Sequence, residues 1–323
     1  MTSRERFVNA LAFKPVDRFP LHELTPSDEM LQQWRTEGMP PDVTFGAYFG
    51  LDRTESVALD MRSRPKMQKF DELRDAAVLR KYYDAATPER YPTDLAQKAA
   101  AWRGRDFPLH VQAWQAGFFQ IMRVGDAATL TEALLSLYDE PMLAHRVMDY
   151  VSDFFLECLG KALREVQPDY AVFGEPIAHN QGPVISPKMF REFVFPYYRK
   201  VTTFLRQHGV THIILETMCN VWPLLPICIE AGITGLYCGM TRNASMDYLR
   251  VRREFGKSLA LIGGIDAGPL LKGKKAIDAE LARTVPPLLA SGGYIPHLDA
   301  RARNLPLESF RYYRAALNRM AQS

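Results

Sequence analysis

The stretch Ile214–Pro226, ILETMCNVWPLLP, joins a short apolar run to a longer segment with helical spacing. The first part predicts the end of a buried strand, and the residues after Asn220 predict a helix. Polar side chains at the carboxyl end of such a strand usually do the chemistry of parallel α/β proteins. The strand end here offers Glu216, Met218 and Cys219, and this set is compatible with a metal site, an altered metal site or a site of another kind.

The same alternation of short apolar strands and longer helices continues along the chain from residue 106. Such alternation predicts parallel strands that are joined by helical crossovers. The expected strands are 109–114, 170–175, 212–216, 234–238, 259–263 and 294–298. The expected helices are 129–137, 141–166, 186–208, 221–231, 246–255, 276–290 and 307–321.

The N-terminal third is less regular. Residues 4–13 predict a helix, residues 18–24 (RFPLHEL) a first strand, and residues 27–37 a helix capped by Ser27. With a further strand near 56–60, about eight strand–helix units are reached, which predicts an α/β fold of the (β/α)8 TIM-barrel type. We expect one domain over residues 1–323 with an N-terminal helical extension, in which residues 25–105 lie irregularly near the barrel mouth. An open doubly wound sheet is the alternative, although no GxGxxG fingerprint follows any predicted strand.

The composition is that of an ordinary globular protein, with 47% hydrophobic and 24% charged residues. A net charge of +3 and the lack of a basic stripe interleaved with aromatic residues argue against nucleic-acid binding. No apolar run approaches the length of a membrane span, and the first residues lack the apolar core of a signal peptide. We therefore expect a cytoplasmic protein. Cys158 and Cys228 fall in helical patterns that favour core packing.

Two glutamates directly follow apolar strands: Glu175 follows YAVFG, and Glu216 follows HIIL. A buried carboxylate is costly unless it is paired or used. If both side chains faced one cavity, burial and mutual repulsion would raise one pKa and create an acid/base pair. We therefore predict Glu175 and Glu216 as the catalytic residues, with an ion pair to a nearby arginine as the structural alternative.

Other side chains near predicted strand ends are candidate contacts to a substrate. These are His22, Trp114, His179, Asn220, Tyr237, Asp266, His297 and Asp299. Each also has a structural explanation, because a lone histidine is more often packed than used. Asp266, in LIGGID, is equally suited to capping a helix.

No metal is expected. If one were present, the ligands would be Glu216, Cys219, Cys238 and His297, since zinc takes Cys, His and carboxylate ligands. Their spacing matches no compact metal motif, and Met218 is a poor zinc ligand. Cys219 would be a reactive thiol if its turn opened a helix N-terminus, where the dipole favours the thiolate.

Several segments resemble proteins of the uroporphyrinogen decarboxylase superfamily, which includes corrinoid-dependent methyltransferases. They are TSRERFVNALAFKPVDRFP, LLSLYDEPMLAHRVMDYVSDF, GPVISPKMFREFVFPYYRKV, NVWPLLPICIEAGITGL, LIGGIDAGPLLKGKKAIDAEL and GGYIPHLDARARNLPLESFRYY, in that order. The resemblance covers most of the chain and is weakest over residues 55–105. It implies a (β/α)8 barrel with the site in the central cleft.

The chain departs from each group of this superfamily at the site. True uroporphyrinogen decarboxylases carry an arginine-rich stretch near the N-terminus that holds substrate carboxylates, where this chain has only Arg18. The zinc methyltransferases carry His-x-Cys where this chain has ETM at 216–218, and a later Cys where it has HLD at 297–299. A third group, with an acidic Asp-Ser-Asp-Gly-type turn, is the most similar, although Met218 and Cys219 replace its second Asp and its Gly.

The resemblance implies an enzyme acting on a small molecule, with methyl transfer in one-carbon metabolism as the leading interpretation. A corrinoid or tetrahydrofolate would be a co-substrate, no tightly bound cofactor and no zinc are expected, and a corrinoid protein and a homodimer are open alternatives for partners. One alternative function is a decarboxylase or other lyase on a tetrapyrrole-like or other carboxylated substrate. It needs a cationic cluster, for which Arg18, Arg123, Arg301 and Arg303 are candidates. The other is a non-catalytic binding protein.

Overall fold

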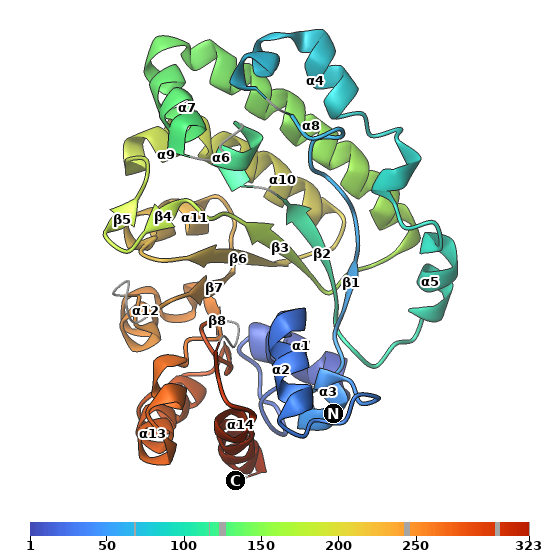
Figure 1. Ribbon diagram of the computed structural model, residues 1–323. Coiled ribbons are helices and arrows are strands. Elements are labelled where there is room, and N and C mark those ends of the chain that lie inside the picture. The colour runs from blue at the N-terminus through green and yellow to red at the C-terminus, as the bar shows by residue number, and fades with distance from the viewer. Residues whose placement is uncertain (68, 116, 123–126, 242–245, 301–303, 323) are drawn as a thin grey trace.

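One curled sheet of parallel strands organises the molecule in the computed structural model, which describes residues 1–322 except 68, 116, 123–126, 242–245 and 301–303. Its strands are β1 (Glu55–Val57), β2 (Leu109–Trp114), β3 (Tyr170–Gly174), β6 (His212–Met218), β7 (Gly235–Gly239), β8 (Ala260–Ile262) and β9 (Tyr294–Ile295), and they lie in that order. β4 (Ala178–His179) and β5 (Gly182–Pro183) form a separate antiparallel hairpin. Figure 1 shows the sheet curving around a centre with most helices outside it.

The helices between the strands confirm the predicted alternation. They are α1 (Ser3–Leu11), α2 (Asp28–Thr36), α3 (Phe45–Phe49), α4 (Ala76–Tyr82), α5 (Leu95–Ala101), α6 (Gly117–Ile121), α7 (Ala127–Asp139), α8 (Pro141–Glu165), α9 (Pro187–Phe193), α10 (Phe195–Gln207), α11 (Leu225–Glu230), α12 (Tyr248–Phe255), α13 (Lys274–Ala290) and α14 (Leu307–Gln322). Short 3-10 turns lie at Phe70–Arg74, Pro88–Arg90, Trp222–Leu224, Gly256–Ser258 and Gly268–Leu271. The single helix predicted over 186–208 is two helices, because Pro196 at the start of α10 has no N–H to continue α9.

Residues 18–24 form no strand, which corrects the sequence prediction. Pro20 removes a backbone donor from this segment, and side chains hold it instead of a ladder. Asp52 accepts a hydrogen bond from the Leu21 amide at 2.9 Å, and Glu23 accepts one from the Leu298 amide at 3.2 Å. Among the described residues the strand ladder is therefore open between β9 and β1, and the expected eight hydrogen-bonded strands are seven.

Helix α1 fills the interior of the sheet at the amino ends of the strands. Thr2 and Glu5 form a capping box that starts the helix. Phe7, Ala10 and Leu11 are buried against inner strand residues, namely Tyr170, Val172, Ile214, Ala260, Ile262 and Ile295. The Phe7 and Tyr170 rings stack with their centroids 5.0 Å apart. Because α1 occupies the amino ends, any ligand inside the sheet must enter at the carboxyl ends.

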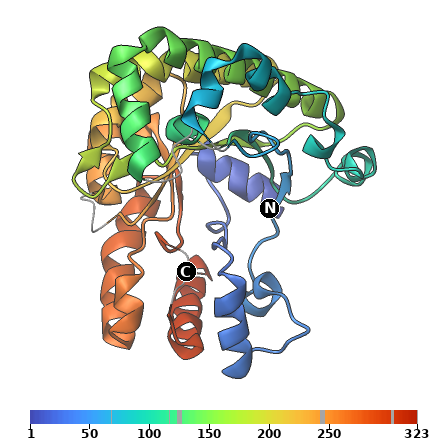
Figure 2. The same ribbon diagram turned by 45° about the horizontal axis from the view of Figure 1, so that its top comes forward.

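The segment expected near the barrel mouth packs mainly against outer helices. Trp34 of α2 contacts Phe310 of α14, with ring centroids 4.7 Å apart, and donates a hydrogen bond to the Leu305 carbonyl at 2.7 Å. Figure 2 shows α2 beside α14, although they come from opposite ends of the chain. Helix α5 packs against α8. Residues 28–49 and 70–101 therefore thicken the outer layer, and β1 between them joins the sheet.

Two further sequence expectations concern cysteines and membranes. All four cysteines are free and buried, and Cys158 in α8 and Cys228 in α11 pack in the core as predicted. Within the described part of the chain, none of the helices combines the length and the apolar character that crossing a membrane requires.

Candidate active site

Successive side chains of a strand point to opposite faces, and this alternation sorts the candidate residues. On β6, Ile214 packs around α1 inside the curled sheet. Leu215 packs in the main core, which contains the outer helices. Glu216 therefore faces the inside of the curled sheet, as Ile214 does. Thr217 faces the outer helices, as Leu215 does, and its hydroxyl donates to the Glu175 carbonyl at 2.7 Å.

The same alternation puts Glu175 on the outer face of the sheet. Gly174 is the register partner of Glu216, so the next residue on the strand turns the other way. The Glu175 carboxylate accepts hydrogen bonds from the Phe118 amide at 2.7 Å, the Tyr198 hydroxyl at 2.9 Å and the Trp114 indole at 3.2 Å. The expectation that Glu175 and Glu216 face one cavity is thus corrected, because the sheet separates them.

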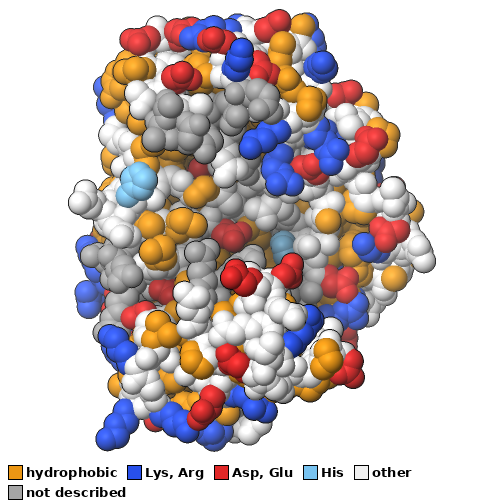
Figure 3. Space-filling model, viewed as in Figure 1, with side chains coloured by type: hydrophobic (Ala, Val, Ile, Leu, Met, Phe, Trp, Pro, Cys, Tyr) orange, Lys and Arg blue, Asp and Glu red, His pale blue; other side chains and the backbone are white. Residues whose placement is uncertain are grey.

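Aromatic rings from separate parts of the chain meet inside the sheet above α1, a space that we call the lumen. The His297 ring lies 5.3 Å from the His22 ring and 5.1 Å from the Tyr237 ring, measured between centroids. Tyr237 is the register partner of Glu216 on the neighbouring strand. Figure 3 shows this face of the molecule hollowed near its centre, with acidic and histidine side chains visible there. The structure therefore brings together four predicted residues, namely His22, Glu216, Tyr237 and His297.

His22 and His297 are both neutral near pH 7. Burial, together with the charges of His110 and Arg314, lowers the pKa of His22 to about 4. Burial, then the charges of His22 and Arg314, holds the pKa of His297 well below its usual value. Both imidazoles therefore offer one hydrogen-bond donor and one acceptor without a charge.

Burial raises the pKa of Glu175 to about 7, against the three hydrogen bonds that lower it. A carboxyl group whose pKa is higher in the folded state binds more protons there than when unfolded. Its contribution to stability is complete below pH 4.5 and is lost as the pH rises through 7.

Between pH 4.5 and 7 the wild type should lose about 3 kcal/mol of unfolding free energy relative to Glu175→Gln, which has no titrating carboxyl group. The figure follows because each unit of pKa shift corresponds to about 1.4 kcal/mol. Urea unfolding at pH 4.5, 6 and 8 measures it. A difference that did not change with pH would contradict the raised pKa.

Trp114 and the two strand-end cysteines also lie on the outer face. Trp114, predicted as a substrate contact, therefore does not face the lumen, and neither do Cys219 and Cys238, which were considered only as ligands of a metal. Trp114 packs edge-on against Tyr198 at 5.1 Å, behind the sheet, and the register shifts between Gln112 and Trp114. Cys238 and Cys219 pack in the main core, where the Cys238 thiol donates to the Cys219 carbonyl at 3.3 Å. Burial raises the pKa of the Cys219 thiol, the opposite of the activation considered above.

The predicted alternative metal ligands do not fit a metal. Glu216 and His297 face the lumen, whereas Cys219 and Cys238 face the outer helices. In the portion of the chain that the structure describes, no three or more His, Cys, Asp or Glu side chains are grouped to hold an ion. We therefore derive no chemical step through zinc.

Asp299 and Asp266 organise the loops at the carboxyl end of the sheet. Asp299 is buried and accepts hydrogen bonds from the Thr241 amide at 2.8 Å, the Thr241 hydroxyl at 2.9 Å and the Ala267 amide at 3.2 Å. Asp266 accepts from the Gly268 amide at 2.8 Å, which holds the start of the following 3-10 turn. These contacts support the structural explanation for both residues.

His179 and Asn220 lie near the rim of the sheet. The Asn220 amide donates to the His179 carbonyl at 3.0 Å, and this bond joins the β4–β5 hairpin to the end of β6. The Asn220 side chain accepts from the Trp222 amide at 3.2 Å, so it also caps the next turn. Met218 and Met240 are exposed at the ends of β6 and β7.

Sequence reasoning missed three lumen residues: His110, Gln112 and Tyr170. His110 stacks on Tyr170 with ring centroids 5.0 Å apart. A Cβ at Gly174 would lie 3.0 Å from the Gln112 amide nitrogen, so Gln112 faces the same side as Gly174. Counting back by twos from Gly174 reaches Tyr170, whereas the register shift after Gln112 hides the lumen orientation of His110 and Gln112 from a count that starts at Trp114.

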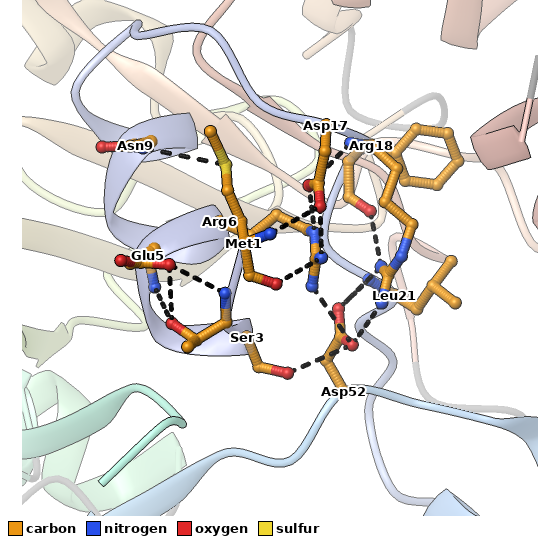
Figure 4. A network of polar contacts seen from close by, with 11 residues as sticks. Met1, Ser3, Glu5, Arg6, Asn9, Asp17, Arg18, Leu21 and Asp52 are labelled. Carbon is orange, nitrogen blue, oxygen red and sulfur yellow. Dashed lines mark hydrogen bonds and ion pairs between the residues drawn. The ribbon is translucent and has the colours of Figure 1, made fainter. Parts of the chain in front are cut away.

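Arg18 takes part in a network at the amino end of the fold (Figure 4). It forms two hydrogen bonds with Asp52, at 2.8 and 2.6 Å, while Arg6 pairs with Asp17. Asp52 also accepts from the Leu21 amide. Arg18 therefore anchors the segment after α1, and the other three arginines proposed for a cationic cluster, 123, 301 and 303, lie outside the described residues.

Comparisons with known proteins agree with this architecture. A family model described as uroporphyrinogen decarboxylase (URO-D) matches residues 118–299. A curated relative, the uroporphyrinogen decarboxylase of Methylibium petroleiphilum, is 22% identical in an alignment over 292 residues that covers 88% of this chain and 72% of the relative. The solved structure of a methyltransferase from Methanosarcina mazei superposes with a TM-score of 0.64 and 16% identity, covering 99% of both chains.

Proposed function

The chain belongs to the uroporphyrinogen decarboxylase family, and from this premise we propose that it is an enzyme that binds a small molecule in the lumen. We further propose that it transfers a methyl group in one-carbon metabolism, with a corrinoid or a folate as co-substrate. The observation that carries the proposal is the meeting of Glu216, Tyr237, His22 and His297 inside the sheet. The name of the Methanosarcina mazei relative in fold supports the choice of methyl transfer.

The lumen groups suit this reaction in specific ways. Glu216 exchanges a proton with the substrate atom that gains or loses the methyl group, which is general acid/base work by a carboxyl group. The neutral imidazoles of His22 and His297 hold substrate polar groups, and the Tyr237 ring provides an apolar wall. A corrinoid, when bound at the rim, supplies the cobalt atom that carries the methyl group.

A carboxy-lyase is the second candidate, and the name of the Methylibium petroleiphilum relative favours it. Such an enzyme must hold substrate carboxylates with cations. Arg18, the first of its candidates, is already bound by Asp52. A binding protein without catalysis is the third candidate.

A paired assay separates these functions. Purified protein is incubated with 5-methyltetrahydrofolate and cob(I)alamin while methylcobalamin formation is followed by absorbance, and with uroporphyrinogen while carbon dioxide release is followed. We expect methylcobalamin and no carbon dioxide. Carbon dioxide release would overturn methyl transfer in favour of the lyase, and turnover in neither assay would favour a binding protein.

A further inference from the structure

The segment that follows β1 is fixed at the carboxyl end of the sheet, where the lumen opens. Gln115, the residue after β2, accepts a hydrogen bond from the Met61 amide at 2.7 Å and donates one to the Leu59 carbonyl. Because β1 and β2 are parallel neighbours, these bonds hold the segment beside the carboxyl ends of both strands. We call residues 59–64 the rim loop.

The acidic side chain of the rim loop faces away from the main core. Leu59 and Met61 are buried in that core, so Asp60 between them points to the opposite side. Ser56 of β1 is the register partner of His110, whose ring lies in the lumen. Asp60 therefore lies at the mouth of the lumen. Figure 3 shows Lys and Arg side chains gathered beside the hollow of this face.

Two arginines share the carboxylate of Asp60. The Nε atoms of Arg64 and Arg62 lie 2.7 and 3.3 Å from its two oxygens. Burial raises the pKa of Asp60, but the bonds from Arg64 and Arg62 lower it further, so the carboxylate is ionised at pH 7. Within the described residues the terminal nitrogens of both guanidinium groups make no hydrogen bond, and the two side chains are 46% and 70% exposed. Their terminal N–H groups can therefore bind a further acceptor.

A buried arginine holds the rim loop from the other side. Arg90 is 1% exposed, and its Nη1 donates to the Asp60 carbonyl at 2.9 Å and to the Arg62 carbonyl at 2.8 Å. Its Nη2 and Nε donate to the carbonyls of Tyr82 and Asp84. Over the part of the chain that the structure describes, Asp60 is the one acidic side chain that pairs with any of these three arginines, so positive charge is in excess here.

The inside of the lumen, in contrast, offers nothing that attracts an anion. It contains the carboxyl group of Glu216 and the neutral imidazoles of His22 and His297. Helix α1 closes the amino ends of the strands. A ligand in the lumen must therefore carry any negative charge at its outer end, over the rim loop.

We propose that Arg62 and Arg64 bind an oxyanion, a carboxylate or a phosphate, at the outer end of the small molecule, and that Arg90 and Gln115 are positioning residues for their loop. The inference deepens the proposed function, because it rests on the lumen holding the rest of that molecule. Guanidinium N–H groups match the paired oxygens of both anions. Asp60 orders the two side chains in advance, which lowers the entropic cost of binding.

Nitrogen-15 NMR of arginine-labelled protein tests the site without any turnover. Inorganic phosphate and succinate are titrated separately at constant ionic strength, with neutral succinamide as the control, and Arg62→Gln and Arg64→Gln assign the Nε signals. We expect both signals to shift with one shared Kd, and the anion that binds more tightly identifies the oxyanion. The signal of Arg191, which pairs with Glu230 on the outer surface, should not move. Shifts that do not saturate, or equal shifts at Arg191 or with succinamide, would overturn the proposal.

Two sets of variants separate binding from positioning. The double variant Arg62→Gln with Arg64→Gln should bind the preferred anion about tenfold more weakly, or worse, in calorimetric titration, whereas Arg191→Gln should bind it as the wild type does. An unchanged Kd in the double variant would overturn the binding claim.

Arg90→Lys keeps the charge but loses the planar set of donors to the loop carbonyls, so we expect weaker anion binding and separate Kd values at the two arginines. Gln115→Leu frees the loop from β2 and should act in the same direction, which decides the positioning role if Arg90→Lys does not fold. Wild-type binding in the folded variants would overturn that role. Failure of the methyl-transfer assay would leave all these results unchanged, since none needs turnover.

Discussion

Glu175→Ala is expected to lower the free energy of unfolding by about 3–5 kcal/mol. The truncation leaves the Phe118 amide, the Trp114 indole and the Tyr198 hydroxyl without their acceptor, in a region where Glu175 is 2% exposed. It also creates a cavity behind the sheet. Urea unfolding followed by circular dichroism at pH 6 measures the loss.

Two controls define this result. Tyr198→Phe removes only one of the donors and should cost about 1 kcal/mol. Glu230→Ala removes an exposed carboxylate of α11 that pairs with Arg191 and should cost less than about 1 kcal/mol. A loss for Glu175→Ala no larger than that of Glu230→Ala would show that Glu175 does not join β2, β3 and α10 as described.

Arg314→Met should lower the free energy of unfolding by a similar amount, about 3–5 kcal/mol, because it leaves a buried carboxylate without its charged partner. The side chains of Arg314 and Glu23 are 2% and 1% exposed. Arg314 also donates to the His22 carbonyl at 3.3 Å, so the loss should loosen the segment that stands in place of a strand. Thermal and urea unfolding measure the effect.

The matched control is Arg191→Met, which breaks the exposed Arg191–Glu230 pair and should cost less than about 1 kcal/mol. The double variant Glu23→Gln with Arg314→Met removes both charges and should recover part of the loss, since a buried pair is often replaced by neutral groups at small cost. Equal losses for Arg314→Met and Arg191→Met would contradict the buried pair.

Much of the fold was predictable because the apolar runs and helical spacings are local signals. β2 and α14 begin at the predicted residues, and Ser27 caps α2 as expected. The segment 18–24 was mispredicted because its apolar pattern resembles a strand. Its Leu21 amide donates to the Asp52 side chain, and its own Glu23 side chain accepts from the distant Leu298 amide. Contacts between residues so far apart leave no periodic signal in the sequence.

The site was predictable only in part. Proximity to a strand end selected four residues that the structure brings together, Glu216, Tyr237, His22 and His297, but it treated Glu175 as their neighbour. The alternation of side chains along β3 would have separated Glu175 from Glu216, because β3 pairs with β6 without a register shift up to Gly174, the residue before Glu175. The same alternation would not have assigned Trp114 to the outer face, because the register shift after Gln112 depends on the packing of β2 against β3.

The most direct measurement of the central claim, that the lumen is the active site, compares turnover of Glu216→Gln and Glu230→Gln in whichever assay the wild type performs. Both variants neutralise a carboxylate, one inside the sheet and one on the outer surface. We predict that kcat falls by about 100-fold or more in Glu216→Gln, as loss of a general acid or base requires, and stays at the wild-type value in Glu230→Gln. Wild-type turnover in a folded Glu216→Gln protein would contradict the claim.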